Sequence, residues 1–178
     1  MNNLHRPNHY QKHLPGEYFV TGRIINSIPL LNTNERKELF FDVLINLVND
    51  HGSDLVAWVI LHEHYHLVIY SENAFTFRRF ITRLHSITAT LLNREDECSG
   101  RKIWYQYWDR RIRNEEDFWR HVNYCHYNPI KHGVIKDLKD QKLDQYCSYG
   151  IWETVFSTEA LDLFYTFYPI DDFDPFVR

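Results

Sequence analysis

The sequence predicts a single α+β domain built around a central antiparallel sheet. Short runs rich in β-branched and aromatic residues alternate along the chain with longer runs in which apolar residues recur at helical spacing. The chain has 178 residues, 44% of them hydrophobic, which is enough for one substantial core. No internal repeat interrupts the pattern, and no run of about 18 apolar residues predicts a membrane span.

The N-terminal part of the pattern predicts one strand and one helix. The strand covers Glu17–Ile25, a run of aromatic and β-branched residues after a proline–glycine pair. Asn32 and Glu35 then have the spacing of a capping box, and Gly52 supplies a C-terminal stop. The apolar residues between them keep helical spacing: Leu39, Phe40, Val43, Leu44 and Leu47. We therefore expect a helix that ends before Gly52.

The middle of the chain predicts two strands, a second helix and a further strand. The strands Ala57–Leu61 and Leu67–Tyr70 lie on either side of a histidine-rich segment. From about Ala74 to Leu92 the spacing predicts an amphipathic helix. Its apolar residues are Phe77, Phe80, Ile81, Leu84, Ile87 and Leu91. The aromatic-rich run Ile103–Ile112 is predicted to form the fourth strand.

A third helix is predicted over Asn114–Tyr127. Asn114 is a good N-cap, and the acids that follow it suit the positive end of the helix dipole. Pro129 predicts that the helix ends near Asn128. At 100° per residue, one face carries the core stripe, which consists of Phe118, Val122 and Cys125. The polar flank beside that stripe consists of Asp117, His121, Tyr124 and Asn128.

The element order β-α-β-β-α-β-α is that of a ferredoxin-like, split-βαβ fold with helices packed on one face of the sheet. We assign this domain to residues 1–150. Residues 151–178 are expected to form an acidic, aromatic C-terminal extension outside the domain, and the composition of residues 164–176 indicates an extended tail.

The triplet His64-Tyr65-His66 is the strongest candidate for a functional site. On a strand, residues i and i+2 point to the same face, so two imidazoles would project side by side from a hydrophobic sheet. Burying both without a ligand costs free energy, and a divalent metal ion is their usual partner. His62-Glu63-His64 is a competing triplet. If the flanking strands form a hairpin, His62 falls in the turn and the projecting pair is His64 with His66.

Charge and cysteine content narrow the class of protein. The net charge is −4, but residues 151–178 alone carry six acidic residues and one basic residue, which leaves residues 1–150 at +1. The basic residues cluster as Arg78, Arg79 and Arg83 in one segment and Arg101, Lys102, Arg110, Arg111 and Arg113 in the next. Such local patches can bind phosphates. The three widely spaced cysteines fit a reducing, cytoplasmic setting.

Two motifs resemble those of a known family. The segment Ala57–Ile69 resembles the histidine–hydrophobic–histidine (HUH) motif of single-tyrosine transposases. Residues 113–133 resemble their catalytic helix, and the ending Asn-Pro-Ile-Lys-His-Gly is most similar to the REP-associated tyrosine transposases. The resemblance covers roughly residues 6–150. It departs from the family at His62, where proline is common, and at Tyr65, where an aliphatic residue is usual.

The resemblance implies a DNA nuclease and strand transferase. Tyr124 would be the nucleophile that forms a 5′-phosphotyrosine, and His64, His66 and Asn128 would hold a divalent metal ion. Mixed nitrogen and oxygen ligands beside a phosphate favour Mg²⁺ or Mn²⁺. His62 and His121 would lie next to these ligands without being counted among them. The substrate would be single-stranded DNA beside a hairpin, the palindromic repeat of the family, contacted by the basic clusters.

Two other readings remain open from the sequence. One is a DNA-hairpin-binding protein whose catalysis is weak. The other is a zinc hydrolase or structural zinc site that uses His62, His64, His66 and Cys125. For the transposase reading we expect a monomer or homodimer in the cytoplasm, associated with the nucleoid and not with a membrane.

Overall fold

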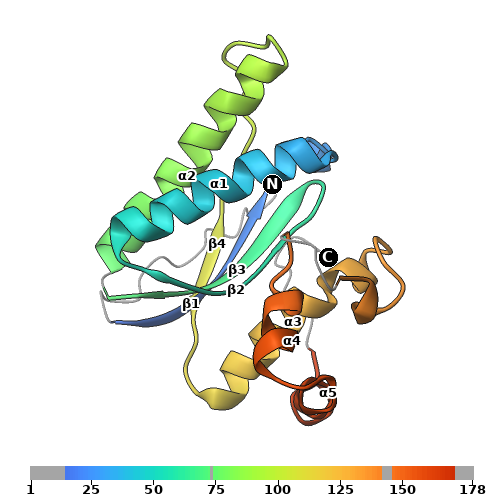
Figure 1. The fold of residues 1–178 in the computed structure, drawn as a ribbon. Coiled ribbons are helices and arrows are strands. Elements are labelled where there is room, and N and C mark those ends of the chain that lie inside the picture. The colour runs from blue at the N-terminus through green and yellow to red at the C-terminus, as the bar shows by residue number, and fades with distance from the viewer. Residues whose placement is uncertain (1–14, 73, 142–145, 171–178) are drawn as a thin grey trace, which may run out of the picture.

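A computed structural model describes residues 15–72, 74–141 and 146–170 (Figure 1). The strands are β1 (Gly16–Arg23), β2 (Asp54–Ile60), β3 (His64–Ser71) and β4 (Trp108–Arg111). The helices are η1 (Ile25–Ser27), α1 (Asn34–His51), α2 (Ala74–Glu95), α3 (Glu115–Lys131), η2 (Leu138–Gln141), α4 (Tyr149–Val155) and α5 (Thr158–Phe167). Within these ranges, no helix has both the length and the apolar character needed to cross a bilayer.

The four strands form one antiparallel sheet in the order β2-β3-β1-β4. Strand β3 lies between β2 and β1 and pairs with β1 along its whole length, from Gly16 opposite Ser71 to Arg23 opposite His64. The α+β class and the ferredoxin-like antiparallel sheet predicted from the sequence are confirmed.

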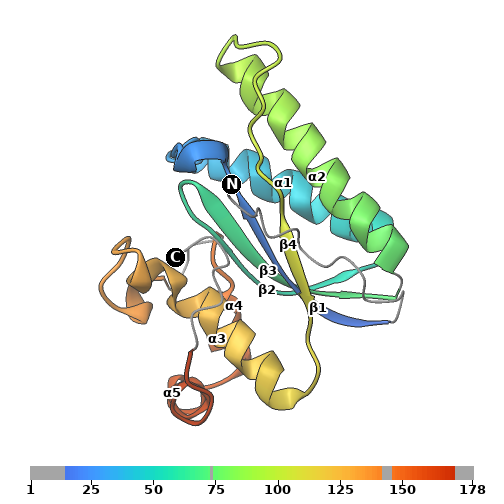
Figure 2. The ribbon, with the colours of Figure 1, turned by 180° about the vertical axis from the view of Figure 1, so that it is seen from behind.

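The prediction that helices cover only one face is correct for α1 and α2 and wrong for the rest of the chain. Helices α1 and α2 lie on one side of the sheet, whereas α3, α4 and α5 lie on the other (Figures 1 and 2). Neighbouring residues of β3 point to opposite faces, and Leu67 and Val68 are both completely buried. A strand that is apolar on both faces needs cover on both sides, and α3 supplies the second layer.

The boundaries of α1, α2 and β4 differ in detail from the prediction. The N-cap of α1 is Thr33 and not Asn32, because the Thr33 hydroxyl accepts a hydrogen bond from the Arg36 backbone N–H at 3.3 Å. Gly52 ends α1 in the left-handed conformation, as expected. Helix α2 is confirmed and runs on to Glu95. The fourth strand is limited to β4, and Trp104 forms only an isolated bridge to Ile24.

Helix α3 continues through Pro129, contrary to the predicted end near Asn128. Asn114 is the N-cap as predicted and accepts from the Asp117 N–H at 2.8 Å. Proline lacks the N–H that would bond to the carbonyl of Cys125 four residues earlier. The Cys147 thiol lies 4.0 Å from that carbonyl oxygen and donates in place of the missing N–H. Only the last turn follows Pro129, so the helix tolerates it.

Most of the described residues after 150 lie in α4 and α5, and the helical conformation of residues 164–167 is contrary to the expected extended tail. Helix α5 packs on α3, with the ring of Phe164 stacked on that of Trp119 at 4.1 Å. The Asn123 side-chain amide donates to the Phe164 and Tyr168 carbonyls at 3.1 and 3.0 Å. Residues 171–178 lie outside the described residues, and the boundary at residue 150 stays a prediction.

The buried His126 joins α3 to the C-terminal segment and makes the fold sensitive to acid. Its Nδ1 lies 3.0 Å from the Tyr165 hydroxyl and its Nε2 lies 2.9 Å from the Ser148 hydroxyl. Burial lowers the pKa of His126 from the ordinary 6.5 to about 3. The unfolded chain takes up this proton below pH 6.5 and the native chain does not, so stability present above pH 6.5 is lost as the pH falls.

We expect the His126 contribution to lower the free energy of unfolding by about 2 kcal/mol when the pH falls from 7.5 to 5. Urea unfolding of the wild-type protein and of His126→Gln at both pH values measures this contribution. The decrease between the two pH values should be about 2 kcal/mol smaller in the variant, because glutamine does not titrate. Equal decreases in both proteins would contradict the prediction.

Candidate active site

His64 and His66 project from β3 toward α3, on the face of the sheet opposite α1 and α2. Both side chains are buried, with 1% and 0% exposed. Their ring centroids lie 5.0 Å apart. Tyr65 between them points to the other face, where it belongs to the core under α1 and α2. The strand alternation predicted from the sequence is therefore present, and it selects His64 and His66 as the projecting pair.

His66 is held so that one ring nitrogen faces the site. Its Nδ1 lies 2.8 Å from the hydroxyl of Thr21, its cross-strand neighbour on β1. Its ring stacks on Phe19 at 5.4 Å. Burial, and then the charge of His64, lowers the pKa of His66 well below its usual value, so the ring is neutral. Its buried Nε2 has no hydrogen-bond partner among the described residues. A neutral ring that donates Nδ1–H to Thr21 leaves the Nε2 lone pair for a ligand.

His64 lies between a carboxylate and an amide oxygen. Its Nδ1 is 3.1 Å from Glu63 Oε1, and its Nε2 is 3.2 Å from Asn128 Oδ1. The hydrogen bond from His64 lowers the pKa of the Glu63 carboxyl, so Glu63 is ionised and accepts the Nδ1 proton. The Nε2 atom of His64 faces the side-chain oxygen of Asn128 on α3. An imidazole nitrogen and an amide oxygen are both atoms that can bind a metal ion.

The polar atoms around these two contacts suit a divalent cation. The buried Nε2 of His66 has no hydrogen-bond partner in the described part of the chain. Ligands about 2.1 Å from Mg²⁺, on adjacent corners of an octahedron, lie about 3.0 Å apart. The 3.2 Å separation of His64 Nε2 and Asn128 Oδ1 is close to that edge. Two imidazole nitrogens and an amide oxygen are therefore a fitting donor set.

Tyr124 and Asn128 lie one turn apart on α3 and are both 1% exposed. The ring of Tyr124 meets the ring of His66 edge to face at 5.0 Å. Its hydroxyl oxygen accepts a hydrogen bond from the Lys131 ammonium at 3.2 Å. Helix α3 therefore places a phenol and an amide against the histidine pair, as the helical spacing predicted.

The structure adds Glu63, Lys131 and His132 to this site, none of which was predicted. His132 is the exposed C-cap of α3, and its ring centroid lies 4.7 Å from that of His64. Among the described residues, Glu63, His64 and His132 are the one His/Cys/Asp/Glu group whose ligand atoms approach within 4.8 Å of one another. The sequence signal that could have found Glu63, Lys131 and His132 is their position next to predicted site residues. Glu63 directly precedes His64, and Lys131 and His132 closely follow Asn128.

The remaining predicted histidines, His62 and His121, are not members of the group formed by Glu63, His64 and His132. His62 lies half-buried in the turn between β2 and β3, and its carbonyl accepts from the Leu31 N–H at 2.8 Å. His121 is buried, with Nδ1 2.6 Å from the Asp117 carbonyl oxygen and its ring 4.5 Å from Phe19. The roles given to them behind the metal ligands stay predictions.

The structure does not assemble the four ligands of the zinc reading. The set His62, His64, His66 and Cys125 does not occur as a metal-ligating group within the described residues. Burial raises the pKa of the Cys125 thiol well above its usual value.

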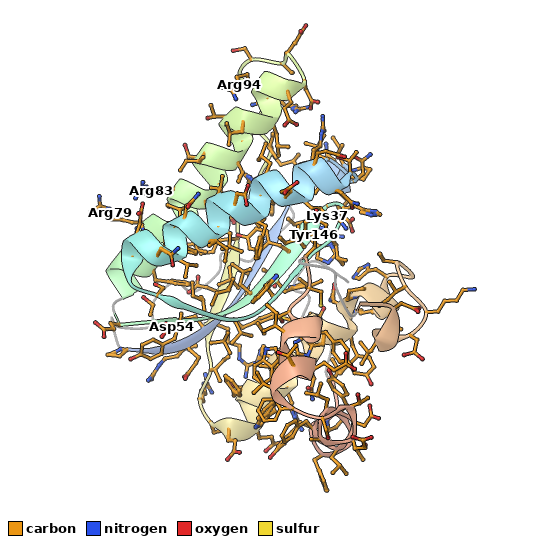
Figure 3. All side chains as sticks on the ribbon, viewed as in Figure 1. Lys37, Asp54, Arg79, Arg83, Arg94 and Tyr146 are labelled. Atoms are coloured by element: carbon orange, nitrogen blue, oxygen red, sulfur yellow. The ribbon has the colours of Figure 1, made fainter. Side chains whose placement is uncertain are left out.

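The predicted basic residues are divided between two regions of the surface. Arg78, Arg79 and Arg83 are exposed on α2, and Figure 3 shows Arg79 and Arg83 at its outer edge, on the opposite side of the sheet from α3. Two members of the second group bond to carboxylates: Arg101 to Asp96 at 2.5 Å and Arg110 to Asp117 at 2.9 Å.

The other three members of the second group differ in their surroundings. The Arg111 guanidinium donates to the Pro15 carbonyl at 3.0 Å. Lys102 and Arg113 are exposed. The predicted basic residues therefore do not form one patch around the histidines.

Comparison with known proteins places these features in context. The family described as IS200-like transposase matches residues 23–113, just over half of the chain, which include both histidines and end before α3. A REP-associated tyrosine transposase of Escherichia coli (strain K12) is 29% identical over 157 residues, covering 88% of this chain and 84% of that protein. The solved structure of a REP-associated tyrosine transposase bound to a REP hairpin matches with a TM-score of 0.63 at 21% identity, covering 88% of each chain. That likeness supports the fold described above.

Proposed function

The chain belongs to the IS200-like transposase family and is therefore an enzyme, and we propose that it cleaves and rejoins single-stranded DNA beside a hairpin. The observation that carries this proposal is the meeting of α3 with β3. There the phenol of Tyr124 lies against His66, and the amide of Asn128 lies against His64. A nucleophile beside a set of metal ligands is an arrangement that suits phosphoryl transfer through a covalent intermediate.

Tyr124 acts as the nucleophile in this proposal. Its hydroxyl group gives up its proton, and the oxygen attacks the scissile phosphorus to form a 5′-phosphotyrosine. The bond from phosphorus to the 3′ oxygen of the preceding nucleotide breaks, and that oxygen takes up a proton. The bond energy stays in the new ester, so a 3′-hydroxyl can attack it and release the tyrosine without ATP. Phe19 and His66 contact the Tyr124 ring from β1 and β3, which limits its motion and orients the oxygen.

His64, His66 and Asn128 would hold a divalent cation, Mg²⁺ or Mn²⁺, which when bound supplies positive charge to the phosphate oxygens. Glu63 orients His64 by accepting its Nδ1 proton, and Thr21 does the same for His66. Because these residues and Tyr124 lie in one chain, the proposed site needs no residue from a second copy, whether the protein is a monomer or a homodimer.

Hairpin DNA is the proposed partner. The relatives are REP-associated transposases, and one solved structure holds a REP hairpin. We assign DNA contacts to the predicted basic residues, foremost to Arg78, Arg79, Lys102 and Arg113, which are exposed. Such an enzyme would act in the cytoplasm, at the nucleoid.

A covalent adduct is the expected product when the full chain is incubated with a palindrome-containing single strand and Mn²⁺. A protein–DNA band that survives denaturation, requires the cation and disappears with EDTA supports the proposal. Mass spectrometry should locate the nucleotide on the peptide that contains Tyr124. Hairpin binding without an adduct under any divalent cation would instead support a DNA-binding protein with weak catalysis.

A further inference from the structure

Lys131 is the last residue of α3, and it lies directly at the oxygen of the proposed nucleophile. Its Nζ is 3.2 Å from the Tyr124 hydroxyl oxygen and 5.1 Å from the centre of the Tyr124 ring. Seven residues along a helix amount to about 20° less than two full turns, so α3 itself holds the two side chains on one face. Asn128 lies on the same face, between them.

The burial of this pair is asymmetric. Tyr124 is 1% exposed, whereas Lys131 is exposed at the end of the helix. The ammonium group of an exposed residue therefore contacts the buried phenol oxygen. An ammonium group donates hydrogen bonds and accepts none, so the phenol oxygen is the acceptor in this contact and its own proton points elsewhere.

We propose that Lys131 is a catalytic residue whose ammonium group holds the Tyr124 oxygen in place and stabilises the negative charge that develops between that oxygen and the phosphate. This inference rests on the proposed function. As the new P–O bond forms, charge moves onto the non-bridging oxygens, within reach of the same ammonium. In the rejoining step that bond breaks, and the ammonium stabilises the departing phenolate. A fixed positive charge at the reacting atoms acts in both directions.

A purely structural role for Lys131 makes a different prediction. A cation in the last turn of a helix is favourable toward the helix dipole, whatever it touches. In that case its removal would change stability slightly and leave the rate of the chemical step unchanged. The two roles are separated by a rate measured at saturating DNA and metal.

The experiment compares Lys131→Met, Lys131→Arg and the matched control Lys136→Met, since Lys136 is an exposed lysine beyond the end of α3. Single-turnover adduct formation on hairpin DNA with Mn²⁺ should slow about 10²-fold in Lys131→Met, the usual effect of removing one stabilising donor. Lys131→Arg keeps the charge and should stay within about tenfold of wild type. Lys136→Met should match the wild-type rate.

The second measurement starts from purified adduct of the wild type and of Lys131→Met. Release of DNA by an added 3′-hydroxyl strand should slow by a similar factor in the variant, while the melting temperature falls by no more than about 4 °C. A Lys131→Met rate within threefold of wild type in both directions overturns the inference and leaves the proposed function standing, provided that Tyr124→Phe is inactive. Adduct formation by Tyr124→Phe would overturn the proposed function as well.

Discussion

Tyr124→Phe is expected to abolish covalent DNA adduct formation, with a loss of at least about 10⁴-fold. Phenylalanine has no oxygen to attack phosphorus, and removing a covalent nucleophile commonly costs this much or more. The fold should survive the change. The ring keeps its contacts with Phe19 and His66, while the hydrogen bond from Lys131 disappears, which costs about 1 kcal/mol.

The measurement is a denaturing gel of protein incubated with labelled hairpin DNA and Mn²⁺, beside a native binding titration. The variant should bind the hairpin as the wild type does and give no denaturation-resistant band. Tyr127→Phe is the matched control, since Tyr127 lies on the same helix but packs against Tyr165 at 4.5 Å. If Tyr127→Phe loses the adduct and Tyr124→Phe retains it, the nucleophile is Tyr127 and the proposal is contradicted.

The core of this site could be predicted because it depends on two periodicities. Alternation along β3 places His64 and His66 on one face, and the helical repeat places Tyr124 and Asn128 on one face of α3. Neither periodicity reveals a contact that depends on how the chain pairs in space. The hydroxyl of Thr21 reaches His66 only because β1 and β3 pair in one register.

The missed features of the fold have a common origin in tertiary context. Pro129 normally ends a helix, but the Cys147 thiol lies near the carbonyl that proline leaves without a donor. Similarly, the aromatic and acidic segment after residue 150 has no clear local signal, yet Phe164 stacks on Trp119 and α5 forms against α3. Neither the Cys147 thiol nor the Trp119 ring could be predicted from local propensity, because each lies far along the chain from the segment that it contacts.

The unusual Tyr65 of the histidine triplet is accommodated by Gly22. The two residues face each other across β1 and β3, on the face of the sheet covered by α1 and α2. The Tyr65 ring packs against Phe40 at 4.9 Å and Trp104 at 5.5 Å, and its hydroxyl lies 2.7 Å from His85 Nε2. A Cβ at Gly22 would lie 2.3 Å from the Tyr65 ring, closer than atoms in contact allow. A bulky residue between the histidines therefore requires a glycine opposite it.

Gly22→Ala should accordingly lower the free energy of unfolding by about 3 kcal/mol, a large part of the roughly 5–15 kcal/mol typical of a domain. The Tyr65 ring cannot move aside without disturbing its neighbours or losing its bond to His85. In the background of Tyr65→Leu, which removes the ring, the same Gly22→Ala change should cost less than about 1 kcal/mol. Urea unfolding of the two single variants and the double variant measures the coupling, expected to be at least about 2 kcal/mol.

Gly52→Ala is the control for a glycine effect that does not involve Tyr65. Gly52 has φ +58° with open space around the position of a Cβ, so alanine there should cost about 1 kcal/mol through backbone strain alone. That cost should be the same in the wild-type background and in the background of Tyr65→Leu. If Gly22→Ala also costs the same in the wild-type background and in the background of Tyr65→Leu, contact with the Tyr65 ring is not the reason for glycine at this position. Because Tyr65 points away from His64 and His66, the variants should also retain the proposed metal ligands.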